Sequence, residues 1–403
     1  MAVANGYGKV ITSGSVFMYD IGDVVNSYKG EPTTNLISNA STMSSWTNYY
    51  RTTASSTFTT EFGTTGYRFV NQPSWNGIYR NFNLSNTGTY TFSAWFRYNG
   101  GSASNNGATV YISNYGGGDT VVGLDKSKVG VWQRVSHTVT VSSPSNVYFY
   151  LISYGGVDSG TGNPDYSSWE VTMPQIELNS HATPFINGTR SATQGLLPLV
   201  GNAALDLTNV SFDSNARMYF DGTNDYIPLS TNIQSGYTQA TYEFVCRPTS
   251  LPSSGYNQLY IQENSTWIGL YTPAGTTAFG IDLGNGSGWF DNNGGFNTGA
   301  KTTSTIYVNT YYHVVYSWDG SSVSVYLNGN LQSTASTLQA SNGRQNVTTL
   351  GAGTTNRGIG SRYAGSANNW VGSIDVIKFY NRALTAAEVK QNYSKYKTRF
   401  NLS

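Results

Sequence analysis

The chain has 403 residues, of which 38% are hydrophobic and 11% charged, and its formal net charge is +1 at pH 7. Aromatic residues make up 14%, with 31 tyrosines and 9 tryptophans, which excludes a disordered chain because disordered segments lack aromatics. The balanced charge excludes a basic nucleic-acid-binding surface, so we expect no nucleic acid among the partners. No apolar run is long enough to cross a bilayer, so we also expect no membrane insertion.

Aromatic and β-branched residues alternate along the chain with Ser, Thr, Asn and Gly, which is typical of β-sheets and their turns. We therefore predict an all-β chain of two or three domains. A single cysteine, Cys246, excludes an intrachain disulfide, and its strand-like surroundings predict a buried thiol. The first residues lack a basic start followed by an apolar core, so we expect no signal peptide.

The amino-terminal part divides into an arm and a strand. Residues 1–14 carry no strong pattern and are interpreted as an arm, whereas SVFMY within the segment 15–31 predicts a strand. From residue 32 to residue 190 the pattern predicts a complete β-sandwich. Its strand TYTFSAWFRY (89–98) alternates cleanly, which places Trp95 on the face opposite the predicted core face. That core face comprises Tyr90, Phe92, Ala94, Phe96 and Tyr98.

Three further strands are predicted in the same sandwich. WQRVSHTVTV (132–141) and NVYFYLISY (146–154) are separated by Ser-Ser-Pro-Ser and are predicted to form a hairpin. SSWEVTMPQIEL (167–178) would be the last strand.

Residues 191–403 predict a second sandwich, with short strands and turns such as Asp319-Gly320 and Asn328-Gly329. Its closing strand runs from Trp370 to Tyr380. A capping box, Thr385-Ala-Ala-Glu388, then predicts a helix over 385–397. Leu384 and Val389 sit where a hydrophobic staple would close over the first turn.

Two phrases in this half suggest a family. G-x-I-D-x-x-x-x-Y-N-R-A-L-T-x-x-E-V (372–389) resembles the carboxy-terminal closure of laminin-G-like (concanavalin A-like) jelly rolls, and FDGTNDYI (220–227) resembles an early strand and turn of that family. SVFMYDIGDVVNSYKG (15–30) resembles its opening strand in phage structural proteins. PQIELNSHATPFINGTR (174–190) resembles the exit of carbohydrate-binding jelly rolls in phage virion proteins. The resemblance implies two jelly-roll β-sandwiches, the second laminin-G/concanavalin A-like with a short helix.

The order of these phrases suggests an insertion. The opening phrase precedes the sandwich 32–190, and the next laminin-G-like phrase follows it. We therefore expect residues 15–19 to pair with the sheet that contains 370–380, with the carbohydrate-binding-module-like sandwich spliced between them. The alternative is two domains in series, with 1–31 as an unrelated arm.

Catalysis is not expected. Glucanases of this fold carry their paired carboxylates as Glu-x-Asp-x-x-Glu, and none of the seven glutamates here forms that motif. The three histidines are isolated, without a nucleophile motif or a zinc-ligand spacing. We therefore predict a protein that is not an enzyme.

Two kinds of binding site remain as hypotheses. Laminin-G-like domains often hold Ca²⁺, and the oxygen ligands of Asp221, Asn224 and Asp225 fit such a hard cation; the alternative is a turn whose side chains bond their own backbone. Sugars need aromatic platforms with polar rims. The alternative for the aromatic residues is a place in the core. The candidates for sugar binding are Trp75, Tyr79, Trp95 and Trp169.

The resemblance implies a non-enzymatic virion structural protein of a tailed phage, serving as tail fibre, appendage or capsid decoration. Its partners would be other virion proteins of the capsid or tail, together with host or environmental glycans in host adsorption. It would be made in the host cytoplasm and act as a homo-oligomer, with a trimer favoured. The alternative is a secreted or surface bacterial lectin or accessory glycan-binding protein.

Overall fold

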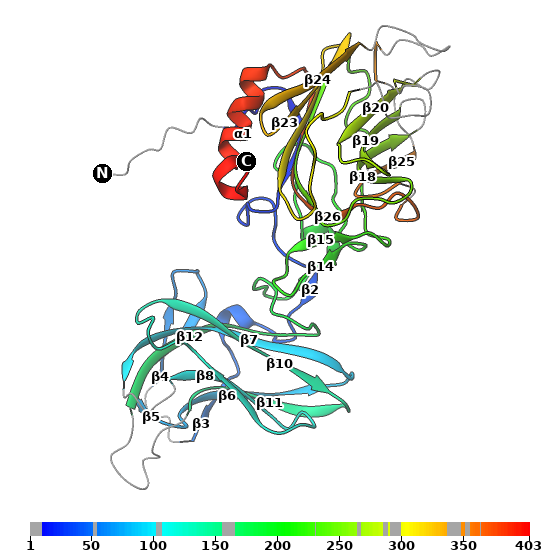
Figure 1. Ribbon diagram of the computed structural model, residues 1–403. Helices are drawn as coiled ribbons and strands as arrows, with labels where there is room; N and C mark the ends of the chain where they lie inside the picture. The colour runs from blue at the N-terminus through cyan, green and yellow to red at the C-terminus, as the bar shows by residue number, and fades with distance from the viewer. Residues whose placement is uncertain are drawn as a thin grey trace, which may run out of the picture. The chain divides into compact units, whose positions relative to one another are not determined.

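The structure is a computed structural model of the chain. It describes residues 10–50, 55–101, 107–154, 166–229, 231–263, 267–284, 289–290, 300–336, 348–350, 355–362 and 364–403. The chain divides into two compact units. The terminal unit comprises Met1–Glu31, Ala192–Asp213 and Arg217–Ser403, and the central unit comprises Pro32–Ser191 and Ser214–Ala216. Each unit is a sandwich of β-sheets (Figure 1), which confirms the predicted all-β class.

Two sheets form the terminal unit. One has the strand order β14-β15-β26-β17-β22-β23-β24, and the other has the order β16-β25-β18-β19-β20-β21. The strands of the first are β14 (Ser211–Phe212), β15 (Met218–Asp221), β26 (Val371–Tyr380), β17 (Ala240–Pro248), β22 (Tyr312–Trp318), β23 (Ser322–Leu327) and β24 (Asn330–Ser336). The strands of the second are β16 (Ile227–Pro228), β25 (Thr355–Ile359), β18 (Tyr256–Glu263), β19 (Trp267–Pro273), β20 (Gly280–Gly284) and β21 (Trp289–Phe290). Both turns predicted from Asp-Gly and Asn-Gly are present, after β22 and after β23.

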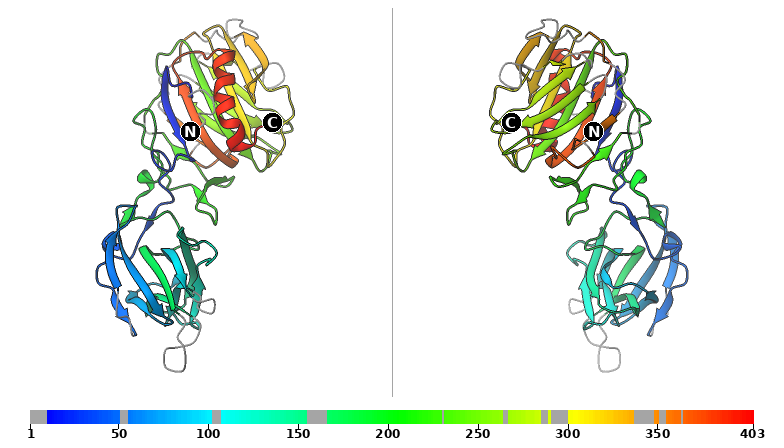
Figure 2. Two further views of the ribbon diagram at one scale, coloured as in Figure 1. Left: turned by 90° about the vertical axis from the view of Figure 1, so that its left-hand side faces the viewer. Right: turned by 90° about the vertical axis from the view of Figure 1, so that its right-hand side faces the viewer.

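The strand β1 (Ser15–Asp20) pairs antiparallel with the end of β26, where Tyr19 faces Ile377. Figure 2 shows the two strands side by side, β1 in blue and β26 in orange. Phe17 and Tyr19 are fully buried, and the Phe17 ring lies 5.4 Å from that of Phe379. This is the pairing that the insertion hypothesis requires, and the main segment of the central unit, Pro32–Ser191, lies between β1 and β14 in the sequence.

The helix α1 (Ala386–Phe400) covers the outer face of the first sheet (Figure 2). Its capping box is present, because the Glu388 amide donates to the Thr385 hydroxyl and the Thr385 amide donates to the Glu388 carboxylate. Leu384 and Val389 share one buried cluster, as the staple predicts. Among the described residues, no helix is long and apolar enough to span a membrane.

The central unit also has two sheets, with the orders β10-β7-β12-β5-β4 and β3-β6-β11-β8-β9. The strands of the first are β10 (Trp132–Val141), β7 (Gly88–Gly101), β12 (Tyr166–Glu177), β5 (Thr65–Pro73) and β4 (Ser55–Thr59). The strands of the second are β3 (Thr47–Tyr49), β6 (Gly77–Leu84), β11 (Ser145–Ser153), β8 (Ala108–Ser113) and β9 (Thr120–Gly123). A short pair, β2 (Thr33–Thr34) with β13 (Thr189–Arg190), joins the two ends of the insert.

The predicted core face of β7 is confirmed, since all five of its residues are buried. The predicted hairpin of 132–141 with 146–154 is wrong. β10 pairs with β7, whereas β11 pairs with β6 and β8 in the opposite sheet. The short polar link therefore carries the chain from one layer of the sandwich to the other, and both strands still turn an apolar face toward the shared core. Alternation reports which face is buried but not which strand is the neighbour.

Candidate functional site

A continuous set of aromatic rings covers the outward face of sheet β3-β6-β11-β8-β9. We call this set the tyrosine face. Its members are Tyr49, Trp75, Tyr79, Tyr111, Tyr148, Tyr150 and Tyr154. All seven side chains are partly exposed. Two of them, Trp75 and Tyr79, are among the predicted sugar-binding residues.

Strand alternation builds this face. β11 turns Val147, Phe149 and Leu151 into the core, so Tyr148 and Tyr150 point outward. The register then sets Tyr150 opposite Tyr79 of β6 and opposite Tyr111 of β8. The ring of Tyr150 lies 5.4 Å from that of Tyr79 and 5.0 Å from that of Tyr111. Three tyrosines therefore form one row across three adjacent strands.

Trp75 extends the row at one end of the sheet. It lies in the tight turn between β5 and β6 with a φ of 66°, a left-handed conformation that is rare for a bulky residue. Its amide donates to the Ser153 carbonyl at 2.8 Å, and its ring lies 4.5 Å from the ring of Tyr154. Because such backbone strain persists only where the surroundings hold it, the position of this ring is fixed by the fold.

The hydroxyls of Tyr111 and Tyr150 stay protonated at neutral pH. Burial raises the pKa of Tyr150, and burial together with Asp119 raises the pKa of Tyr111 well above its usual range. The Tyr111 hydroxyl donates to the Asp119 carboxylate at 2.5 Å. These two tyrosines therefore present aromatic carbon and neutral hydroxyl groups.

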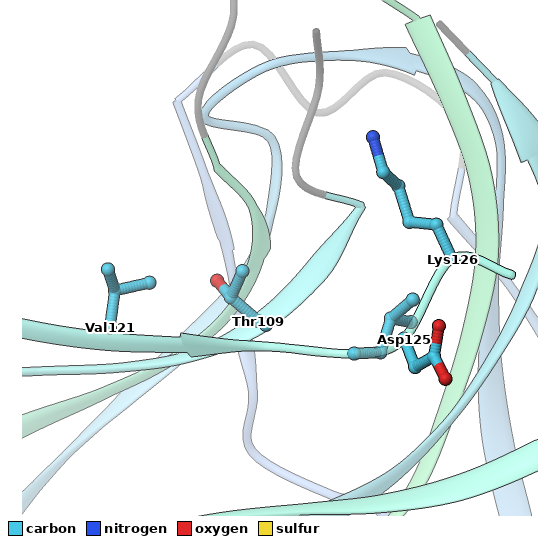
Figure 3. Close-up of a pocket in the computed structure, with 6 residues that line it drawn as sticks. Thr109, Val121, Asp125 and Lys126 are labelled. Carbon is cyan, nitrogen blue, oxygen red and sulfur yellow. The ribbon is translucent and has the colours of Figure 1, made fainter. Parts of the chain in front are cut away.

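A hollow of about 380 Å³ borders this row on the side of β9. Six residues line it, as Figure 3 shows: Thr109, Val121, Gly123, Leu124, Asp125 and Lys126. Val121 lies directly opposite Tyr111 in the register of β8 and β9. The hollow thus adds a polar, charge-bearing edge to an aromatic surface.

Trp95 and Trp169 do not belong to this face. Trp95 is partly exposed on the outward side of the other sheet, where its ring lies 5.8 Å from that of Phe62. Trp169 is fully buried and stacks on Phe69 at 4.1 Å. The proposal of Trp169 as a sugar platform is wrong, because both sheets enclose its ring in the core.

The predicted calcium ligands form a compact turn. The buried Asp225 carboxylate accepts hydrogen bonds from the Asp221 amide at 2.6 Å and the Ser211 hydroxyl at 3.2 Å. Asp221 accepts from the Thr223 amide at 2.7 Å, and Asn224 is exposed. These bonds are those of the turn alternative, and among the described residues no group of three His, Cys, Asp or Glu side chains is placed to hold a metal ion. Calcium at this turn remains a prediction.

Sequence reasoning missed five members of the tyrosine face. Their signal lies in strands with large side chains at both alternating sets of positions, as in VYFYL (147–151). One set fills the core, and the other can only face outward. The Cys246 thiol, by contrast, is buried as predicted.

Comparison with known protein families assigns most of the second half of the chain to a known fold. Residues 221–390 match the family described as the concanavalin A-like lectin/glucanases superfamily. The terminal unit therefore contains a concanavalin A-like domain, as the closing phrase suggested. A comparison with curated proteins gives no match.

Several solved structures resemble parts of the chain. Domain 4 of a Geobacillus stearothermophilus arabinanase in complex with arabinotriose is 18% identical, with 48% of this chain and 82% of that chain covered and a TM-score of 0.33. The binding domain of botulinum neurotoxin serotype G is 14% identical, with 51% and 49% covered and a TM-score of 0.38. A sialidase CBM40 from Ruminococcus gnavus bound to α2,3-sialyllactose is 19% identical, with 38% and 82% covered and a TM-score of 0.29. The chain thus spans about half the length of the neurotoxin domain.

Proposed function

We propose that this protein binds glycans without catalysis, and that the tyrosine face of the central unit is the binding surface. The observation that carries the proposal is the row Tyr79–Tyr150–Tyr111, three rings in contact across three strands on a partly exposed face. A pyranose ring has an apolar C–H face and hydroxyl edges. A surface of aromatic carbon with phenolic hydroxyls offers partners for both.

The glutamates support a binding role. Glu170, Glu177 and Glu243 are buried, and each accepts hydrogen bonds from neighbouring side chains. None of these three carboxylates is placed to act on a bound polymer, whereas glycoside hydrolysis needs two carboxylates that face the substrate.

A virion location remains a finer proposal, which the phrases at 15–30 and 174–190 favour. In this proposal the protein is a homotrimeric tail or capsid appendage that uses its glycan sites in many copies, since weak sites gain from multivalency. The alternative, a bacterial lectin, has the same binding chemistry. Labelling of intact phage particles with an antibody to this chain, viewed by electron microscopy, distinguishes the two.

The binding proposal is tested with the full chain on an array of immobilised oligosaccharides. We expect Tyr150→Ala and Trp75→Asn to weaken binding at the tyrosine face at least tenfold, because each removes a ring. Asparagine tolerates the left-handed backbone at position 75, so the fold is kept. Tyr307→Ala is the matched control, since that side chain is 65% exposed in the terminal unit. Unchanged binding of every glycan by both variants would contradict the proposal.

A further inference from the structure

We propose a second glycan site, for neutral saccharides, on the opposite sheet of the central unit. Phe62, Trp95 and Trp132 form it together with Glu61, and we call these four residues the tryptophan face. The site goes beyond the function proposed above, because it uses none of the residues of the tyrosine face and lies on the other side of the sandwich core.

The three rings come from separate parts of the chain. Trp95 of β7 and Trp132 of β10 lie on adjacent strands and point outward. Phe62, at the turn between β4 and β5, reaches both of them, with ring centroids 5.8 Å from Trp95 and 5.7 Å from Trp132. Phe62 is 44% exposed. The rings meet at 52° and 59°, so together they form a stepped aromatic surface instead of a closed stack.

The turn that carries Phe62 is held in place. The hydroxyls of Thr60 and Thr64 lie 2.9 Å apart, and that of Thr64 lies 2.8 Å from the hydroxyl of Thr172 on β12. The Thr60 amide also donates to the Thr64 carbonyl at 2.8 Å. A ligand therefore meets a surface that is already ordered, and less conformational entropy is lost on binding.

The polar groups beside the rings form a network of ion pairs in which two carboxylates balance two guanidinium groups. Glu61 Oε1 accepts from the Trp132 indole at 2.5 Å and from Arg97 at 3.2 Å. Arg97 also pairs with the buried Glu170, which in turn pairs with Arg68. The cationic groups are thus engaged by carboxylates inside the unit, and the Arg97 guanidinium lies over the Trp132 ring.

One hydrogen-bond acceptor of this ion-pair network faces solvent. The Glu61 side chain is 52% exposed, and among the described residues only its Oε1 atom receives hydrogen bonds. The Oε2 atom can therefore accept hydrogen bonds from sugar hydroxyls, which are charge-assisted and stronger than neutral ones. A uronic or sialic acid would bring a carboxylate next to this carboxylate, and like charges repel. The chemistry favours neutral pyranosides.

The test uses the full chain with Tyr79→Ala and Tyr150→Ala, so that the tyrosine face is disabled. Its binding to immobilised neutral oligosaccharides (cello-, xylo- and manno-series) and to acidic ones (oligogalacturonate, sialyllactose) is measured on one array. We expect this background to keep binding to a neutral series and to bind none of the acidic ones. Adding Glu61→Gln with Phe62→Ala should weaken that binding at least tenfold, whereas Val70→Ala, at a 56% exposed position of the same unit, should not.

A further variant distinguishes a protein that fails to fold from one that folds but lacks the binding site. Phe62→Leu retains apolar packing but removes the ring, so it should keep the melting temperature of the background and still weaken binding. A background that binds no glycan while the wild type does would place all binding on the tyrosine face and overturn the second site. Binding that survives the Glu61 and Phe62 changes, or a wild type that binds no glycan, would overturn it as well.

Discussion

The Glu243 carboxylate lies 3.2 Å from the Lys378 ammonium, and both side chains are buried between the first sheet of the terminal unit and helix α1. The same carboxylate accepts from the Tyr380 hydroxyl at 3.1 Å and the Asn392 amide of α1 at 2.7 Å, and His313 lies 3.1 Å away. Burial opposes ionisation, but the Lys378 charge and the His313 hydrogen bond outweigh it and lower the pKa of Glu243 to about 2. This network ties the helix to the sheet.

Removing one partner of the Glu243–Lys378 ion pair should lower the free energy of unfolding more than removing both. Glu243→Leu leaves Lys378 buried without a counter-charge, and we expect it to lower the free energy of unfolding by about 3–5 kcal/mol. The double variant Glu243→Leu, Lys378→Met has no buried charge and should recover most of that loss. Urea unfolding, followed by tryptophan fluorescence, measures both. A single variant within about 0.5 kcal/mol of the wild type would contradict a buried ion pair.

The side chain of Asp375 should make stability fall as the pH rises. Burial raises its pKa from 3.8 to about 6, against the opposing effects of its bond from Ser373 and the charges of Arg399 and Arg247. Because the folded-state pKa lies above the unfolded one, the folded protein binds more protons between these values. The stabilisation is therefore present below about pH 4 and lost through about pH 6.

Because the pKa of Asp375 rises from 3.8 to about 6 on folding, the effect on the free energy of unfolding is about 3 kcal/mol. Asp375→Asn cannot titrate, so its stability relative to the wild type should rise from pH 4 to pH 7 by that amount. Thermal unfolding of both proteins across this range gives the difference. A difference that does not change with pH would show that Asp375 titrates normally in the folded state.

Trp169 should respond to truncation as a core residue. Trp169→Ala removes a fully buried ring that stacks on Phe69 and lies 6.0 Å from Phe96, and we expect the central unit to lose about 3–5 kcal/mol. Trp75→Asn removes a partly exposed ring and should cost less than about 1.5 kcal/mol. Chemical unfolding of the two variants side by side makes the comparison, and equal losses would contradict the different burial of these rings.

Local sequence signals predicted the start of helix α1 correctly. The cap and the staple depend only on local spacing, because the four residues that form them lie within six consecutive positions, Leu384 to Val389. The helix continues three residues beyond the predicted end at 397, and Asn401 ends it in a left-handed conformation. Local spacing carries little information about such an end, because asparagine is common in other contexts too.

Distant contacts explain what the sequence could not predict. β12 is buried on both faces, because the exit segment after it covers its polar side: the Thr183 amide donates to Glu177, and the Ile186 amide donates to Gln175. In the first half of β12, Trp169 and Val171 alternate with Glu170 and Thr172, so the pattern itself favoured the core position of Trp169 over a sugar platform. The tyrosine face likewise depends on Tyr79, Tyr111 and Tyr150 becoming neighbours through strand pairing, which follows from the layer each strand joins.

Variants of Asp225 can distinguish a structural role of this turn from calcium binding. Asp225→Ala removes the acceptor of the Asp221 amide and of the Ser211 hydroxyl in a buried place, so we expect a loss of about 1–3 kcal/mol even in a chelator. Asp225→Asn keeps one acceptor oxygen, removes the charge and should lose less. If calcium also binds there, the wild-type melting temperature rises with added calcium by mass action, and both variants lack that rise. Differential scanning calorimetry in calcium and in chelator measures both effects. Identical wild-type curves would exclude calcium at this turn, and an Asp225→Ala variant as stable as the wild type in chelator would contradict the structural role.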